Sequence, residues 1–478
     1  MNILAIDQGT SATKALVLGP GNEVLGSAEE PVHPRSTADG GVEQDPEELY
    51  RSVLGAGTAA LGQARAPVQA MALANQGETV LAWDRRSGRA LTPAIVWQDR
   101  RSSDICRRLS GSADRLAAIT GLPLDPYFAA PKMTWLRENL TAEGVVTTTD
   151  TWLLARLGAG YVTDAATASR TLLLDLETAD WSAEACGVFG LDPGALPEVG
   201  DCAGAFGETA AFGPSLPVTG LAVDQQAALL AERCFAAGEA KCTYGTGAFL
   251  LATTGPAPVR STAGLSASVA WRLAGSATYC LDGQVYTAGA AVRWLAGLGL
   301  VPSAEGLDAA GGSVPDSGGA VFVPALAGLG APHWRPEARG AFLGLGLGVT
   351  RAHLARAVVE GIAASVALLA GSLAVDGAPV GRLRADGGLT RSRLLVQAQA
   401  DLLQVPVEVS KAHDATALGV AALARLGAGD HDDLAEAVGQ AEVEWVAEPA
   451  ITADQAAERL AAYDLAVRAV LAQGAPSR

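Results

Sequence analysis

The stretch that decides the fold is Ala5-Ile6-Asp7-Gln8-Gly9-Thr10-Ser11-Ala12-Thr13-Lys14, close to the start of the chain. The apolar runs on either side of it predict two strands joined by a tight polar turn. Glycine lets the backbone approach a ligand closely, and hydroxyl and lysine side chains can contact phosphate oxygens. Taken alone, the stretch fits an ordinary hairpin with a polar tip equally well.

A second stretch with the same pattern is Lys241-Cys242-Thr243-Tyr244-Gly245-Thr246-Gly247-Ala248-Phe249, half a chain later. A repeat at this spacing indicates duplicated domains rather than a solenoid. Because each half contains one Gly-Thr turn, two facing hairpins could hold a polyphosphate between them. We therefore predict an N-terminal domain over residues 1–235 and a C-terminal domain over residues 236–478.

Composition favours a well-buried globular protein with two domains. The chain has 478 residues, of which 49% are hydrophobic and 18% charged. Its formal net charge of −17 and its lack of a basic patch predict that it does not bind nucleic acid. The absence of a C-x-x-C pair, of a secretory leader and of a long uncharged stretch predicts a cytoplasmic protein with reduced thiols and no membrane insertion.

Strands and helices follow one another without strict alternation, which predicts an α/β fold. Asp45 is expected to cap a helix that runs to about Leu61, because proline and glutamates follow it. A longer helix is expected over residues 350–373. The strand at residues 383–386 ends in two glycines before another helix, which is a plausible nucleotide-contacting turn.

Two further segments carry polar groups that suit a small ligand. Asp224 follows an apolar strand and begins a helix, so it can be an N-cap or a catalytic carboxylate, and the pattern alone favours the cap. Trp97 precedes Gln98 and Asp99. A flat aromatic beside an amide and a carboxylate suits the carbon face and hydroxyls of a polyol.

Several segments, in order along the chain, resemble the FGGY carbohydrate kinases, and within that family most closely the glycerol kinases. The matching segments are Asp7-Gln8-Gly9-Thr10, Glu43-Gln44-Asp45-Pro46, Ile95-Val96-Trp97-Gln98-Asp99, Asp224-Gln225-Gln226-Ala227-Ala228, Thr243-Tyr244-Gly245-Thr246-Gly247, Gly328-Leu329-Gly330-Ala331-Pro332 and Asp386-Gly387-Gly388. Such a series is far more specific than any single motif.

The resemblance implies two actin-like (ribonuclease-H-like) domains that close over a catalytic cleft holding ATP and Mg²⁺. It implies Asp224 as the general base and Asp7 as a residue near Mg²⁺. It also implies a homodimer or a homotetramer as the assembly to test. The implied substrate positions are Glu78, Trp97, Tyr127, Asp224, Gln225 and Phe249. The implied nucleotide and phosphate positions are Thr10, Ser11, Lys14, Thr246, Gly289, Arg293 and Gly388.

The chain departs from glycerol kinases at several of these places. Gly77 stands where the resemblance leads us to expect a substrate-binding arginine, which removes a forked hydrogen-bond donor and leaves space. Ala130-Pro131-Lys132 is more similar to xylulose kinases. Ala12 and Arg293 replace a hydroxyl residue and a glutamine near the expected nucleotide. A glycine-rich effector segment is shortened to residues 211–217.

We therefore expect an ATP-dependent kinase that phosphorylates a terminal hydroxyl of a small polyol or sugar. A xylulose-type ketopentose kinase or a tetritol kinase is the alternative within the same class. A non-kinase actin-like ATPase or a sugar-binding sensor is the alternative from another class. Against the latter stand the base at Asp224 and the polar residues expected around a polyol, which a scaffold does not need.

Overall fold

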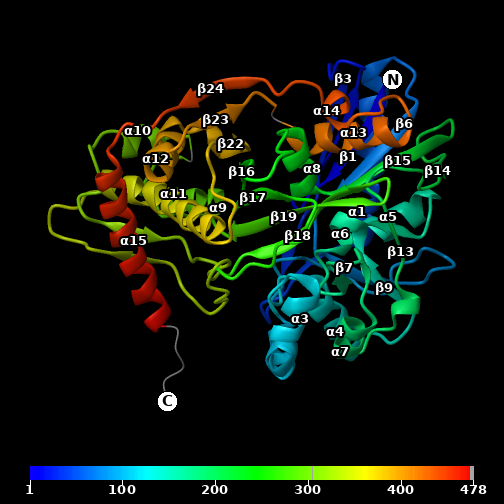
Figure 1. Ribbon diagram of the computed structural model, residues 1–478, viewed down its shortest axis with the longest axis horizontal. Coiled ribbons are helices and arrows are strands. Elements are labelled where there is room, and N and C mark those ends of the chain that lie inside the picture. The colour runs from blue at the N-terminus through cyan, green and yellow to red at the C-terminus, as the bar shows by residue number, and fades with distance from the viewer. Residues whose placement is uncertain (304, 413, 474–478) are drawn as a thin grey trace.

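The computed structural model describes residues 1–303, 305–412 and 414–473. Figure 1 shows two α/β halves side by side, each built on a twisted sheet with helices against it. The expected α/β fold is confirmed. The first sheet has the order β14 (Glu208–Thr209), β15 (Leu216–Val223), β6 (Ala70–Asn75), β1 (Ile3–Gln8), β2 (Ala12–Leu18) and β3 (Val24–Pro31).

The second sheet lies in the other half and comes from later residues. Its order is β18 (Ser266–Leu273), β19 (Ser276–Val285), β17 (Ala248–Gly255), β16 (Ala240–Tyr244), β22 (Leu383–Asp386), β23 (Val407–Ser410) and β24 (Val443–Ala447). The predicted hairpins at Gly9-Thr10 and Gly245-Thr246 are confirmed as the β1–β2 and β16–β17 turns.

The two sheets repeat one topology. In the first, β1 pairs antiparallel with β2 and parallel with β6, and β2 pairs antiparallel with β3. In the second, β16 pairs antiparallel with β17 and parallel with β22, and β17 pairs antiparallel with β19. The parallel neighbours continue into β15 and β23. The duplication predicted from the two Gly-Thr turns is therefore a duplication of whole sheets.

Helices bury both faces of the first sheet. Ile3 and Ala5 of β1 point to one face and Leu4 and Ile6 to the other, and all are fully buried. The second face packs against α1 (Pro46–Ala64), for which Asp45 is the N-cap, as predicted. The first face packs against α13 (Ala415–Gly427).

Helix α13 packs in the first half although it comes late in the chain: it lies beside β1 and β6 (orange against blue in Figure 1). It packs tightly on α8 (Asp224–Ala231): a Cβ at Gly419 would lie 1.8 Å from the Ala227 carbonyl oxygen. This packing ties the second half of the chain to the strand and helix that carry Asp224. The domain boundary at residues 235 and 236 stays a prediction.

The long predicted helix is α11 (Arg351–Val375), which packs in the core of the second half. Among the described residues it alone is long and apolar enough to cross a membrane, and 56% of its apolar window is buried inside the protein. Its place in the core agrees with the expectation of a core helix. The cysteines are all free and buried.

Smaller elements complete the two halves. A third sheet contains β4 (Arg35–Ser36), β5 (Val42–Gln44), β8 (Ala94–Ile95), β7 (Val80–Trp83) and β9 (Val145–Thr148). The strand pairs are β10 (Val162–Asp164) with β13 (Glu198–Gly200), β11 (Leu174–Asp175) with β12 (Asp180–Trp181), and β20 (Val321–Val323) with β21 (Ala341–Leu343). The other helices are α2 (Ser103–Arg108), α3 (Ala113–Thr120), α4 (Ala129–Asn139), α5 (Thr149–Leu157), α6 (Ala165–Ala168), α7 (Ala183–Phe189), α9 (Gly289–Gly297), α10 (Leu307–Gly311), α12 (Arg393–Leu403), α14 (Leu434–Val438) and α15 (Ala453–Gln473).

Candidate active site

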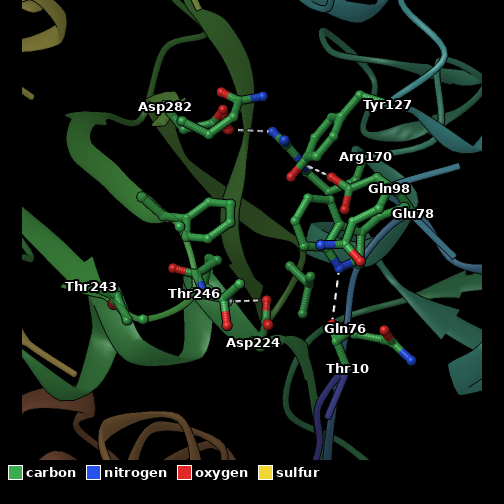
Figure 2. A pocket seen from close by; sticks show the side chains of 18 of the residues that line it. Thr10, Gln76, Glu78, Gln98, Tyr127, Arg170, Asp224, Thr243, Thr246 and Asp282 are labelled. Carbon is green, nitrogen blue, oxygen red and sulfur yellow. Dashed lines mark hydrogen bonds and ion pairs between the residues drawn. The ribbon is translucent and has the colours of Figure 1, made fainter. Parts of the chain in front are cut away.

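A pocket of about 270 Å³ lies where the two halves meet (Figure 2). The first half contributes the β1–β2 turn and the segments after β6 and β8, and the second half contributes the β16–β17 turn and β19. The predicted site residues that line it are Thr10, Ser11, Glu78, Trp97, Tyr127, Asp224, Gln225, Thr246 and Phe249. Residues far apart in the sequence thus share one cavity.

The two Gly-Thr turns face this pocket together, as the repeat predicted. Thr10 and Ser11 come from the first turn, and Gly245 and Thr246 from the second. The first turn is held by Gln44, whose amide donates to the Thr10 carbonyl at 2.7 Å. The hydroxyls and backbone groups of both turns are therefore placed to meet one phosphate chain.

Asp224 lies at the junction of β15 and α8, facing the pocket in Figure 2. The N-cap of α8 is Val223, and Asp224 is the first helical residue, so the simple cap interpretation is wrong. Its Oδ1 accepts a hydrogen bond from the Gln225 backbone N–H at 2.6 Å. Burial raises the pKa of the Asp224 carboxyl, and the nearby Lys241 ammonium opposes this shift.

Asp7, the predicted metal-side residue, is the penultimate residue of β1 and is not among the residues that line the pocket. Burial and the charges of Asp224 and Asp414 raise the pKa of Asp7 to about 8. Lys14, predicted to contact phosphate, pairs with Asp414 instead of pointing freely into the pocket. The structure thus gathers several carboxylates and one lysine beside the first turn.

An aromatic wall encloses one side of the pocket. Trp97 lies edge-on to Tyr127 and to Phe249, with ring centroids 5.8 and 6.0 Å apart. The indole Nε1 of Trp97 donates to the Thr10 hydroxyl at 2.9 Å. This bond connects the aromatic wall directly to the first Gly-Thr turn.

Glu78 belongs to a buried ionic cluster that sequence reasoning missed in part. Arg170 Nε donates to Glu78 Oε1 at 2.8 Å, and its Nη1 pairs with Asp282 across the two halves. All three side chains line the pocket. Burial raises the pKa of Glu78 to about 7, against the opposing effect of Arg170.

Three of the predicted nucleotide residues, Gly289, Arg293 and Gly388, lie around the end of β16 and do not line the pocket. Arg293 lies with its guanidinium 3.5 Å from the Thr246 hydroxyl. A Cβ at Gly289 would lie 2.6 Å from the Gly245 carbonyl oxygen, so glycine permits this approach. Gly388 is exposed and follows β22, whose neighbour is β16. The structure thus brings Gly289, Arg293 and Gly388 to the end of the second sheet at which the parallel strands β16 and β22 terminate.

The residues that sequence reasoning missed are Gln76, Arg170, Val223, Lys241, Asp282 and Gln284. Lys241 is fully buried and donates to Gln225 Oε1 at 2.6 Å and to the Thr243 hydroxyl at 2.7 Å. Arg170 lies in a hydroxyl-rich run, and Asp282 interrupts an apolar one. A charged residue in such a run indicates a buried charge that needs a partner. No such signal points to Val223.

Gly77 lines the pocket, and a valine methyl group lies close to its backbone. A Cβ at Gly77 would lie 2.9 Å from Val223 Cγ2, and Val223 is 2% exposed. This contact limits the space beside Gly77, and the effect of the glycine on the substrate stays a prediction. Next to the Gly77 backbone, the valine methyl already fills the volume where a side chain would begin.

Both halves of the chain match models of one family. The N-terminal domain model of the FGGY family of carbohydrate kinases matches residues 2–231, and the C-terminal domain model matches residues 240–428. The chain therefore belongs to the FGGY family of carbohydrate kinases. It is a kinase of the polyol and carbohydrate class, and the family implies ATP as phosphoryl donor.

Glycerol kinases are similar over nearly the whole chain. The glycerol kinase of Aromatoleum aromaticum is 42% identical, covering 97% of this chain and 98% of that protein. The glycerol kinase of Thermus brockianus is 46% identical, covering 89% and 90%. The crystal structure of Plasmodium falciparum glycerol kinase with ADP superposes with a TM-score of 0.89 at 30% identity, covering 98% of each chain.

Proposed function

We propose that this protein transfers the terminal phosphoryl group of ATP to a terminal hydroxyl of a small polyol, as a glycerol kinase-like enzyme. The observation that carries the proposal is the position of Asp224. Its carboxylate shares one pocket with the hydroxyls of Thr10 and Thr246 and with the aromatic wall. A base, a phosphate clamp and a polyol-binding surface therefore meet in one place.

In this mechanism Asp224 accepts the proton of the attacking hydroxyl. Glu78, Gln225 and the rings of Trp97, Tyr127 and Phe249 hold the acceptor, with the carbon chain against the aromatic rings. Thr10, Ser11 and Thr246 donate to phosphate oxygens, and Lys14 adds positive charge when it leaves Asp414. Catalysis of this kind consists mainly of positioning and neutralising charge.

The residues around Asp7 fit a magnesium ion that arrives with the nucleotide. The described residues contain no group of three His, Cys, Asp or Glu side chains arranged to hold a metal. Mg²⁺ typically keeps several waters and takes few protein ligands besides phosphate oxygens. A divalent cation nearby would offset the repulsion between Asp7 and the carboxylates that raise its pKa. When bound, the ion neutralises charge on the transferring phosphate.

The nucleotide side is formed by Gly289, Arg293 and Gly388 around the second turn. The similarity to a glycerol kinase crystallised with ADP supports this assignment. The guanidinium of Arg293 beside the Thr246 hydroxyl is placed to meet a phosphate oxygen.

A tetritol or a xylulose-type ketopentose is the second candidate for the acceptor. The glycine at position 77 favours it, since the forked donor expected there in glycerol kinases is missing. The similarity to curated kinases disfavours the non-kinase ATPase and the sugar sensor. A cytoplasmic enzyme that forms a homodimer or homotetramer remains our working assignment.

The test is an ADP-release assay with glycerol, tetritols, pentitols and ketopentoses, using the wild type, Asp224→Asn and Asp114→Asn. Asp114 is an exposed carboxylate on α3 and serves as the matched control. Loss of a general base should lower kcat by about 10²- to 10⁴-fold, with the control unaffected. ADP release that ignores every polyol and survives Asp224→Asn would refute the proposal.

A further inference from the structure

Strand β19 presents two polar side chains to the pocket that the roles above do not use. Asp282 and Gln284 are two residues apart on the strand, so both point to the same face. Both line the pocket, and they are only 6% and 2% exposed. Gln284 lies directly opposite Phe249 in the β17–β19 ladder, beside the aromatic wall.

These side chains have hydrogen-bonding capacity that the described part of the chain does not satisfy. Both amide atoms of Gln284 have no partner among the described residues. Asp282 Oδ1 is also unpaired there, although the Ser266 hydroxyl, opposite it in the β18–β19 ladder, lies close enough to lower the pKa of Asp282. The other carboxylate oxygen of Asp282 is held by Arg170. Because buried polar atoms are almost always paired, unpaired atoms that line a pocket indicate a ligand with complementary groups.

The ligand chemistry follows from the atoms that are free. A carboxylate oxygen accepts a hydrogen bond from a hydroxyl, and an amide can both donate a hydrogen bond to a hydroxyl and accept one from it. A row of one carboxylate and one amide beside an aromatic ring is suited to neighbouring hydroxyls on a carbon chain. It is not suited to phosphate, which the carboxylate would repel.

The row also lies far from the reacting end of the acceptor. Figure 2 shows Asp224 and Asp282 at opposite ends of the pocket, with Arg170 and Glu78 on the side between them. Arg170 binds both Glu78 and Asp282, so it joins the two regions into one continuous polar surface.

We propose that Asp282 and Gln284 form a second hydroxyl-binding subsite, and that the acceptor is a polyol or ketose of four or five carbons. This inference rests on the proposed function. The terminal hydroxyl meets Asp224, the next hydroxyls meet Glu78, and the hydroxyls beyond the third carbon meet β19. Glycerol reaches only Asp224 and Glu78 and leaves Gln284 unpaired, whereas a longer acceptor also forms hydrogen bonds with Gln284.

One alternative partner for Gln284 is a buried water. A separate cavity of about 20 Å³ lies behind it, lined also by His333 and Tyr463, and His333 Nε2 is likewise unpaired in the described structure. Such a volume can hold one water. If that water satisfied Gln284 completely, the residue would act only on stability. The experiment separates these two roles.

The test compares Gln284→Leu with the wild type and with Gln440→Leu, a matched change at an exposed position. We measure kcat and KM for glycerol, tetritols, pentitols and ketopentoses, and the dissociation constant of each acceptor without ATP. We expect the wild type to prefer a four- or five-carbon acceptor. Gln284→Leu should weaken its binding and kcat/KM by about tenfold, mainly through KM, with glycerol much less affected.

Three outcomes would overturn the subsite. They are a wild-type preference for glycerol, an equal loss for glycerol and longer acceptors, and a loss of thermal stability without any change in specificity. Failure of the proposed function looks different, because the wild type would then show no acceptor-dependent ADP release at all. Binding of a longer acceptor without ATP would still report on the subsite in that case.

Discussion

The contact between Gly77 and Val223 leads to a quantitative prediction. A Cβ at Gly77 would lie 2.9 Å from Val223 Cγ2, whereas carbon atoms prefer about 3.5–4.0 Å. Gly77 does not adopt the left-handed backbone conformation, so the backbone itself accepts a side chain. Overpacking of this kind costs about 1–3 kcal/mol. Gly77→Ala should therefore destabilise the protein, although replacing glycine at an unstrained site usually stabilises by about 0.4–1 kcal/mol.

The assay is a double-mutant cycle with Gly77→Ala, Val223→Ala and both together, followed by urea denaturation. Val223→Ala removes the methyl group that the new Cβ would meet. In that background Gly77→Ala should become neutral or stabilising, which gives a coupling free energy of about 1–3 kcal/mol. The cycle cancels the cavity that Val223→Ala creates by itself.

The same pair predicts an effect on specificity. Gly77→Arg alone should not improve the use of glycerol, because the side chain must displace Val223. Gly77→Arg with Val223→Ala should increase kcat/KM for glycerol relative to longer acceptors, because the guanidinium can then reach two hydroxyls. Equal costs of Gly77→Ala in both backgrounds, or a full gain from Gly77→Arg alone, would refute the reasoning.

Further predictions concern the wall and the ionic cluster. Trp97→Phe removes the indole N–H that donates to Thr10 and should raise KM for acceptor and for ATP by about fivefold; a change in only one KM would contradict the link. Arg170→Met leaves Glu78 and Asp282 without their ionic partner. Urea denaturation should show a free energy of unfolding lower by about 3–5 kcal/mol. A loss below about 1 kcal/mol would show that the cluster is solvated. The pKa of Glu78 is about 7 in the native state and 4.5 as the ordinary value. The native state therefore binds more protons between these pH values, and stability falls as pH rises through that window. Glu78→Gln should flatten this part of the stability profile, and an unchanged slope would assign it to other groups.

Much of the fold follows from local patterns in the sequence. The apolar run before Asp7 is buried on both faces, which is why it predicts a central strand. Asp45 caps α1 because the proline and glutamates after it favour the first turn of a helix. The two Gly-Thr turns predict the duplication because each terminates a central strand in the same topology.

The tertiary structure decided features that depend on residues distant in the chain. Helix α13 packs on the first sheet although its sequence belongs to the second half, and glycines at Gly220, Gly419 and Gly427 permit the close approach. The role of Asp224 as first helical residue rather than cap depends on the backbone of Val223. Hydrophobic periodicity in the sequence indicates which face of its own helix or strand a residue occupies. It does not indicate which distant segment packs against that face.

The difference between what the sequence predicts and what the tertiary structure decides is clearest at the acceptor site. The sequence by itself predicted the two Gly-Thr turns and the polar segment at Trp97, because each is a short motif with its own chemistry. The family resemblance added Asp224 as the base and the other aromatic residues, and these roles stay predictions. The sequence did not determine what fills the space beside Gly77 or which polar atoms remain unpaired at Gln284. Those depend on packing between segments that are distant in the sequence: β15 against the segment after β6 in the first half, and β19 against β17 in the second.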